Sequence, residues 1–462
     1  MMTMNGASAQ MRRFNPFALL AALKGKLSGD TGAVAGTVIF LNVTRIVSSA
    51  ILTRLLSAEA FGVVGIITSV SVTFGLMSDI GINAFIIRHK DSNDPKFLDE
   101  LWTLRMMRSL ALTIGVAVLS GPIANYLDKP DLQMAIAAGG LIFLLDGLDS
   151  MMFFTALRNR EVKRLNKIDI IAQMFGVVAS IALALLLRNY WAILTANLLG
   201  QLFRVWVSYA WFEGSRRRWS LSRPRAAELW KFSRFITGST ILTLIISQTD
   251  KVALSKLFPL ELFGLYMIAN NLAGAPTGLA GTYSNRILYP RLAQLAREAP
   301  ETLRWEYYHQ RLQVSLLYAF AVGGMITCAP LIITMLYDDR YLPAIVYLQV
   351  LLVSSFFLMG TLAANQVMIA LGHSMFTLYT NVVRLIFLVI GGWWAYTNYG
   401  TFGLVWVVGL LEMVALLFGW IWLYRLRLFS WSKEALILLA GAAGLAIGYA
   451  ANLAGLSLLR LL

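Results

Sequence analysis

LTRLLSAEAFG (residues 52–62) occurs a second time in altered form, as LSKLFPLELFG (residues 254–264). Leu, Glu, Phe and Gly coincide at corresponding positions, and Thr/Ser and Arg/Lys replace each other conservatively. The second copy starts 202 residues after the first (254 − 52). A motif repeated at this distance indicates that the chain is an internal duplication.

The composition around the two copies is that of a polytopic membrane protein. Of the 462 residues, 58% are hydrophobic and 14% are charged, against about 25% charged residues in an ordinary soluble domain. The single cysteine, Cys328, excludes a disulfide within one chain. The three histidines are scattered, so neither a metal site nor any other cofactor is expected.

The apolar runs predict thirteen membrane spans, because a bilayer core needs about 20 apolar residues per helix. The last run is compatible with one span, two spans or an interfacial helix. The runs are 33–56, 60–87, 102–127, 132–157, 165–187, 190–212, 234–257, 260–289, 311–337, 343–371, 374–397, 402–424 and 434–459.

The connections between these spans alternate in charge. Those after spans 2, 4, 6, 8 and 12 are basic, whereas those after spans 1, 3, 5, 7, 9 and 11 are tight turns with few charges. Because Lys and Arg collect in cytoplasmic loops, the N-terminus and the basic connections are predicted to be cytoplasmic. This pattern accounts for the net charge of +15 without nucleic-acid binding.

A second repeat divides the chain into two halves. YLDK (126–129) closes span 3 and YDDR (337–340) closes span 9. The sequence therefore predicts an all-α fold of two parallel six-helix repeats with about one extra C-terminal helix, 12–14 spans in total. Parallel repeats are related by an axis along the membrane normal, and the substrate path lies between them.

The expected domain organisation follows from this division. An amphipathic cytoplasmic segment is followed by an N-lobe of spans 1–6 and a basic cytoplasmic linker that we expect to contact anionic lipid. A C-lobe of spans 7–12 and the extra helix complete the chain. The corresponding ranges are 1–30, 31–212, 213–233, 234–425 and 426–462.

The duplicated motif itself allows two interpretations. Glu59 and Glu261 fall where the next helix begins, so that a carboxylate meets the positive end of the helix dipole. The final glycine of each copy, Gly62 or Gly264, allows a close approach. The motif is then a hairpin-shaping element, although direct contact with a substrate stays open.

Ionisable groups inside the spans are the candidate functional residues, because a charge at mid-bilayer is costly and is retained for a purpose. Central positions are held by Arg45, by Asp146 with Asp149 one turn along, by Arg384 and by Glu412. Off-centre polar candidates are Asp79, Gln248, Asp250, Lys251, Asn270, Asn271 and Arg286. One hypothesis is that these groups line a hydrated substrate cavity. The other is that they form buried ion pairs, Arg45 with Asp146 and Arg384 with Glu412.

Three stretches carry a family resemblance. LTRLLSAEAFGVVGI (52–66), with SDIGINAFIIRHKD (78–91), resembles the N-terminal signature of Wzx-type bacterial polysaccharide exporters. These belong to the MOP (multidrug/oligosaccharidyl-lipid/polysaccharide) superfamily, which includes MATE-like transporters. ISQTDKVALSKLFPLELFGLYMIANNLAG (246–274) resembles the seventh and eighth helices of the same family.

The resemblance implies a flippase rather than an enzyme. Such a protein moves an undecaprenyl-diphosphate-linked oligosaccharide between the leaflets of the bacterial cytoplasmic (inner) membrane by alternating access, for exopolysaccharide, capsule or O-antigen synthesis. The implied partners are the polyprenyl-diphosphate-linked glycan, membrane lipids and a polysaccharide polymerase or export machinery, and no nucleic acid. A proton or Na⁺ could couple to transport.

Several alternatives stay open at the level of sequence. A cation-coupled multidrug antiporter and a lipid II flippase belong to the same superfamily. A membrane glycan polymerase is a different class, disfavoured by the very short loops on the outer side. A purely structural scaffold is another alternative, but it does not explain the charged residues at mid-bilayer.

Overall fold

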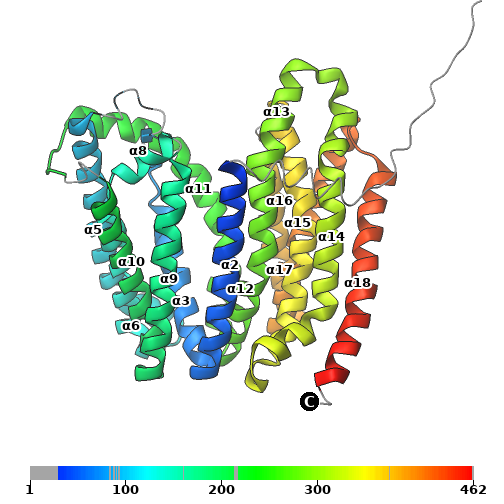
Figure 1. Ribbon diagram of the computed structural model, residues 1–462, viewed down its shortest axis with the longest axis horizontal. Coiled ribbons are helices and arrows are strands. Elements are labelled where there is room, and N and C mark those ends of the chain that lie inside the picture. Colours follow the sequence, from blue (N-terminus) through cyan, green and yellow to red (C-terminus); the bar gives the residue numbers. More distant parts are fainter. Residues whose placement is uncertain are drawn as a thin grey trace, which may run out of the picture.

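The computed structural model describes residues 30–459, except 83, 84, 87, 88, 90, 92, 93, 160, 213–216 and 374. The amphipathic segment expected at 1–30 therefore lies almost entirely outside the described residues. Every regular element in the described ranges is a helix, and the helices stand in two groups side by side (Figure 1). The predicted all-α polytopic fold is confirmed.

The first group corresponds to the predicted N-lobe. Its helices are α2 (Asp30–Leu55), α3 (Ala58–Met77), α5 (Pro95–Tyr126), α6 (Gln133–Gly139), α7 (Leu141–Leu148), α8 (Met152–Arg158), α9 (Val162–Leu187) and α10 (Trp191–Trp211). A short 3₁₀ turn at Pro130–Leu132 precedes α6.

The second group corresponds to the predicted C-lobe and the extra helix. Its helices are α11 (Arg223–Leu257), α12 (Leu260–Tyr283), α13 (Tyr289–Glu298), α14 (Leu303–Leu336), α15 (Ala344–Ala370), α16 (Met375–Ile386), α17 (Gly392–Arg425) and α18 (Trp431–Leu459). π turns at Ser284–Leu288 and Phe387–Gly391 and 3₁₀ turns at Pro300–Thr302 and Asp339–Tyr341 link some of them.

Nine helical segments of the described chain are long and apolar enough to cross a membrane. One of them, Met375–Arg425, combines the expected spans 11 and 12 across a kink at Gly400, where φ is 64°. The helices α10 and α12 are not among the nine, because amide and charged side chains lower their hydropathy. Both stand parallel to the others in Figure 1.

Two expected spans are interrupted where polar residues lie. Span 2 was expected to continue to residue 87, but α3 ends at Met77 and the chain turns at Gly81, where φ is 64°. The carboxylate of Asp79 accepts the Gly81 N–H at 2.9 Å and stabilises this turn. Span 4 (132–157) is divided into α6, α7 and α8. The backbone of Asp149 is extended (φ −53°, ψ 140°). Asp146 and Asp149 therefore do not share a helix face, and that prediction is wrong.

The linker expected at 213–233 is helical in its second half, because α11 begins at Arg223. Its basic residues Arg217 and Arg225 pair with acids of α5, Asp99 at 3.5 Å and Glu100 at 3.1 Å. For these two arginines, the expected contact with anionic lipid is replaced by a protein contact. The start of α11 is thereby fixed to the N-lobe, and α11 as a whole packs on α3, α16 and α17.

The extra helix α18 is a single helix that packs along α14 (Figure 1). Small residues allow the two backbones to approach closely, as is typical of membrane helix pairs. A Cβ atom on Gly444 would lie 2.1 Å from the Phe320 carbonyl oxygen. Arg311 of α14 and Glu434 of α18 are both buried and form an ion pair, so α18 is joined to the C-lobe by packing and by charge.

The duplicated motif forms the contact between the two lobes. A Cβ atom on Gly62 would lie 2.2 Å from the Leu260 carbonyl oxygen, and one on Gly264 would lie 1.8 Å from that of Ala58. Ala58 and Leu260 are 202 positions apart, as are the two glycines (260 − 58 and 264 − 62). The contact is therefore reciprocal, and α3 and α12 cross with their backbones touching. The motif is a packing element at the end of the molecule that carries the short turns.

The second repeat reinforces this crossing in the same reciprocal way. Lys129 of YLDK donates from Nζ to the Ser255 carbonyl oxygen at 2.8 Å. Arg340 of YDDR donates from Nη2 to the Thr53 carbonyl oxygen at 3.1 Å. Thr53 and Ser255 are equivalent positions of the first motif. Arg340 is oriented by Asp338, and its hydrogen bonds hold the pKa of that carboxyl below its usual range. The cation that ends YLDK or YDDR in one lobe therefore contacts the LSKLFPLELFG or LTRLLSAEAFG motif of the other lobe.

Gly264→Ala is expected to destabilise the fold by about 1–3 kcal/mol, because a methyl group at the crossing overlaps the Ala58 carbonyl. Gly115→Ala is the matched control: it lies in α5, and no other atom lies within 4 Å of the place that its Cβ would take. The control should gain up to about 1 kcal/mol from helix propensity. Thermal unfolding of the detergent-solubilised variants measures both. If Gly264→Ala unfolded at the same temperature as Gly115→Ala, this packing would be contradicted.

The double variant Lys129→Ala/Arg340→Ala is expected to let the lobes separate at the short-turn end. Each substitution removes a charged donor from a backbone carbonyl of the other lobe, which weakens only this junction. Spin labels at D131C and D339C, in a Cys328→Ala background, should gain a longer distance component. Arg291→Ala, an exposed change on α13 at the other end, is the control and should leave the distances unchanged. An unaltered distribution in the double variant would show that the two contacts do not hold the lobes.

Candidate functional site

A cavity of about 580 Å³ lies between α2, α3, α9, α10 and α12. The first four of these helices belong to the N-lobe, and α12 belongs to the C-lobe. The cavity therefore lies mainly in the N-lobe and is completed from the other half. Its polar lining side chains are Arg45, Ser48, Ser49, Thr68, Asp169, Gln173, Ser180, Asn197, Gln201, Arg204 and Asn271.

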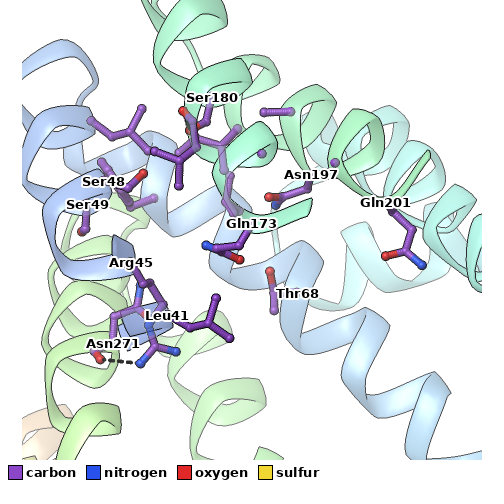
Figure 2. Close-up of a pocket in the computed structure, with 18 of the residues that line it drawn as sticks. Leu41, Arg45, Ser48, Ser49, Thr68, Gln173, Ser180, Asn197, Gln201 and Asn271 are labelled. Atoms are coloured by element: carbon purple, nitrogen blue, oxygen red, sulfur yellow. Dashed lines mark hydrogen bonds between the residues drawn. The ribbon is translucent and has the colours of Figure 1, made fainter. Parts of the chain in front are cut away.

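Arg45 is the cation of this cavity that has no acidic partner. Its Nη2 donates to Asn42 Oδ1 at 2.8 Å and to the Asn271 carbonyl oxygen at 3.5 Å (Figure 2). Its Nε is buried and has no hydrogen-bond partner among the described residues. No carboxylate of the described chain lies within ion-pair distance of it. A guanidinium in this condition has donors available for an anion.

Amide and hydroxyl groups cover the wall opposite Arg45. Gln173 of α9 and Asn197 of α10 lie near each other in Figure 2, with Thr68 of α3 beside them. Such groups both donate and accept hydrogen bonds. The apolar side chains Leu52 and Phe61 belong to the duplicated motif and also line the cavity. The wall can therefore hydrogen-bond hydroxyl groups and pack against apolar ring faces.

The second cation, Arg204, has an acidic partner in Asp169. Its Nη2 lies 3.7 Å from Asp169 Oδ1, and its guanidinium stacks over the Phe153 ring at 5.0 Å. Arg204 also lines a second cavity of about 230 Å³, together with Asp79, Asp146, Asp149, Arg105 and Arg108. The two cavities adjoin at Arg204. Gln201 of the first cavity is 3.5 Å from Asp149 Oδ2 in the second.

The second cavity holds ion pairs that differ from the one suggested by sequence. Asp146 pairs with Arg105 at 3.2 Å, and not with Arg45. The expected Arg45–Asp146 pair is wrong because α7 packs on α5, which places Asp146 beside Arg105. Arg108 donates to the Ser78 and Gly75 carbonyl oxygens at 2.6 and 3.0 Å. It thereby satisfies the carbonyl groups left free where α3 ends.

The structure distributes the twelve predicted residues over several places. Arg45 and Asn271 line the first cavity, and Asp79, Asp146 and Asp149 line the second. The other seven line neither of these two cavities: Gln248, Asp250, Lys251, Asn270, Arg286, Arg384 and Glu412. Sequence reasoning therefore located the N-lobe groups but could not separate them from the charges of the C-lobe.

Most of the C-lobe charges have protein partners. Arg384 donates to Glu412 at 2.6 Å, which is the ion pair suggested by the second hypothesis. Asp250 is buried, accepts the Tyr266 hydroxyl at 2.6 Å and lies 3.5 Å from Lys251. Arg286 is exposed on the π turn after α12. These contacts join neighbouring helices to one another.

Sequence reasoning missed the polar face of α9 and α10. Asp169 and Gln173 are four residues apart in expected span 5, and Asn197, Gln201 and Arg204 recur at helical spacing in span 6. Residues at this spacing share one helix face. The signal was present: Asp169 and Arg204 are ionisable groups inside apolar spans, the same criterion that singled out Arg45.

Curated relatives include two proteins of bacterial polysaccharide synthesis. The lipopolysaccharide biosynthesis protein WzxC of Escherichia coli (strain K12) is 23% identical over 334 residues, covering 71% of this chain and 66% of WzxC. The succinoglycan biosynthesis transport protein ExoT of Rhizobium meliloti (strain 1021) is 23% identical over 254 residues, covering 55% of this chain and 51% of ExoT. The matched regions span about half to two thirds of these relatives.

Solved structures share the two-lobed fold. The lipid II flippase MurJ in an inward closed conformation gives a TM-score of 0.71 at 12% identity, over 91% of this chain and 92% of MurJ. An inward-facing multidrug resistance MATE family transporter of the MOP superfamily gives 0.58 at 16% identity, over 87% of this chain and 98% of that chain. These likenesses confirm the MATE-like fold.

The family is established by a sequence model described as polysaccharide biosynthesis protein, which matches residues 51–346. The matched range contains both copies of the duplicated motif, the helices of the first cavity from α3 onward, and the reciprocal contacts of Lys129 and Arg340. The resemblance seen in the sequence is confirmed. This multi-pass membrane protein belongs to the polysaccharide biosynthesis protein family.

Proposed function

We propose that this protein moves a polyprenyl-diphosphate-linked oligosaccharide across the bacterial cytoplasmic membrane, with Arg45 binding the diphosphate. The observation that carries the proposal is the guanidinium of Arg45, which has no acidic partner among the described residues. Apart from the Asp169–Arg204 pair, the other polar groups of its cavity are amides and hydroxyls. Arginine suits this ligand because its planar fork donates two parallel hydrogen bonds to phosphate oxygens. The names of the relatives, a lipopolysaccharide biosynthesis protein and a succinoglycan biosynthesis transport protein, support transport in polysaccharide synthesis.

The sugar residues next to the diphosphate bind the opposite wall. Gln173, Asn197 and Gln201 present amide groups to the cavity, and Thr68 adds a hydroxyl. The volume of about 580 Å³ is within the usual range of about 300–1,000 Å³ for small-molecule sites. It suits a headgroup whose polyprenyl chain stays in the lipid. No bond is made or broken in this process, so the protein acts as a transporter and not as an enzyme.

Alternating access follows from the placement of the contacts between the lobes. The glycine crossing and the contacts of Lys129 and Arg340 all lie at the short-turn end. We assign the opposite, basic end to the cytoplasm by the positive-inside rule, which also places the N-terminus inside. The headgroup enters from the basic end, and separation of the crossing releases it outside to the polymerase or export machinery.

A multidrug antiporter of the same superfamily fits the cavity less well. A cationic drug would meet Arg45 without a neighbouring carboxylate and be repelled. The likeness to MurJ is a likeness of fold and does not distinguish lipid II from another polyprenyl-diphosphate glycan.

Arg45→Ala is expected to abolish export of the surface polysaccharide while the protein still inserts in the membrane. Binding of undecaprenyl diphosphate in nanodiscs should weaken about tenfold to a hundredfold, which corresponds to roughly 1.5–3 kcal/mol for hydrogen bonds to a charged group. Arg45→Lys should recover part of the binding, since a point charge replaces the planar fork. The exposed Arg291→Ala is the control. Wild-type export and binding by Arg45→Ala would refute the assignment.

The Arg384–Glu412 pair is expected to be structural. Glu412→Leu alone leaves a mostly buried guanidinium (15% exposed) without its acidic partner and should cost up to about 3–5 kcal/mol, the loss found for fully buried pairs. The double variant Arg384→Met/Glu412→Leu removes both charges and should restore most of the thermal stability in detergent, with export retained. A stable double variant that fails to export would instead give Arg384 or Glu412 a part in transport.

A further inference from the structure

Asp149 is a buried carboxylate whose charge the surrounding protein does not neutralise by direct contact. Asp149 is 6% exposed and lines the second cavity. Oδ1 is buried and has no hydrogen-bond partner among the described residues. Oδ2 has only Gln201 Nε2, at 3.5 Å. A buried carboxylate with so few donors is costly in its charged form and favours a bound proton.

The charged and titratable groups around Asp149 come from α5, α7, α10 and the turn after α3. They are Arg105 and Arg108 of α5, Asp146 of α7, Arg204 and Tyr209 of α10, and Asp79 in the turn after α3. Arg105 forms an ion pair with Asp146, and Arg108 donates hydrogen bonds to the carbonyl groups at the end of α3. None of these cations lies within 4.0 Å of the Asp149 carboxylate in the described structure. Arg204 is the cation that lines both cavities and has only Asp169, at 3.7 Å, as an acidic partner.

The chemistry of this environment selects a proton over Na⁺. Hard cations require several oxygen ligands around them. Asp149 instead has an N–H donor of Gln201 at 3.5 Å. In its cavity Asp146 is already paired with Arg105, and Asp79 holds the turn after α3. Three guanidinium groups share this cavity. These groups repel a metal cation but allow protonation of a single oxygen. The cavity of about 230 Å³ is polar and large enough for several water molecules at about 30 Å³ each, which can deliver the proton.

We propose that Asp149 is a proton-binding site coupled to the substrate cavity through Arg204. When the diphosphate occupies the first cavity, Arg204 is held on the side of Asp169 and the anion, and Asp149 takes a proton from water in the second cavity. When the anion leaves, Arg204 turns to Asp149, and the proton returns to that water. The inference rests on the proposed function for its ligand, but the proton site itself can be tested without any substrate.

Infrared difference spectroscopy of the purified full-length protein tests the site directly. Without substrate, Asp149 is ionised near neutral pH in the proposed cycle, so the titration starts at acidic pH. A stepwise rise in pH from there should remove a C=O stretching band of one protonated carboxyl, and this band should be absent in Asp149→Asn. Asp149→Asn mimics the neutral acid and should fold. Asp149→Glu should retain a displaced band, and the exposed Asp131→Asn should keep the wild-type spectrum. A wild-type protein without such a band, or a band unchanged in Asp149→Asn, would overturn the proposal.

Calorimetric titration with undecaprenyl diphosphate tests the coupling. Titrations in buffers of different ionisation enthalpy report protons taken up on binding, and linkage predicts about one proton per bound diphosphate. Uptake should fall to near zero in Asp149→Asn and in Arg204→Gln. Binding without proton uptake in the wild type would refute the coupling and leave the proposed substrate intact. Absence of binding, with the carboxyl band present, would refute the proposed substrate and with it the assigned coupling, but not the proton site.

Discussion

Backbone contact between α3 and α12 is the constraint on which the rest of the structure depends. Gly62 and Gly264 each lie against a carbonyl group of the opposite helix, so no side chain fits between them. The hydrophobic core near this crossing is shared by the lobes, with Val63 and Ile66 on one side and Phe263 and Leu348 on the other. The crossing also brings α12 beside α2, and the Asn271 carbonyl then meets Arg45. The first cavity is completed only because the two lobes touch here.

The sequence was sufficient for the architecture because the duplication preserved its packing residues. The glycines, and the Lys129 and Arg340 turns, could be recognised as repeats, and the structure shows each repeat contacting the other lobe. The helix breaks at Gly81 and Asp149 could not be predicted by the same reasoning. Hydropathy averages over a span, and a local turn inside an apolar run leaves that average almost unchanged.

The candidate site was predictable only in part, for a related reason. A lone charge in a span indicates a purpose, but its partner depends on rotations of helices that the sequence does not specify. Arg384 and Glu412 pair as one hypothesis stated, whereas Arg45 and Asp146 do not. Asp146 lies beside Arg105 because α7 packs on α5. Arg204 is also an ionisable residue inside an apolar span, but it was not among the predicted site residues.

The two halves keep a common crossing but differ in their charges. The residue 202 positions after Arg45 is Ser247, so the C-lobe has no equivalent guanidinium there. Both larger cavities lie mainly in the N-lobe, while buried ion pairs fasten the C-lobe, among them Arg311 with Glu434. A matched crossing with unequal interiors fits the proposed transport, because two lobes that meet and separate need matched surfaces whereas an anionic ligand needs a cation on one wall. Arg45 of the N-lobe supplies a cation for that wall, while the ion pairs of the C-lobe join its helices to one another.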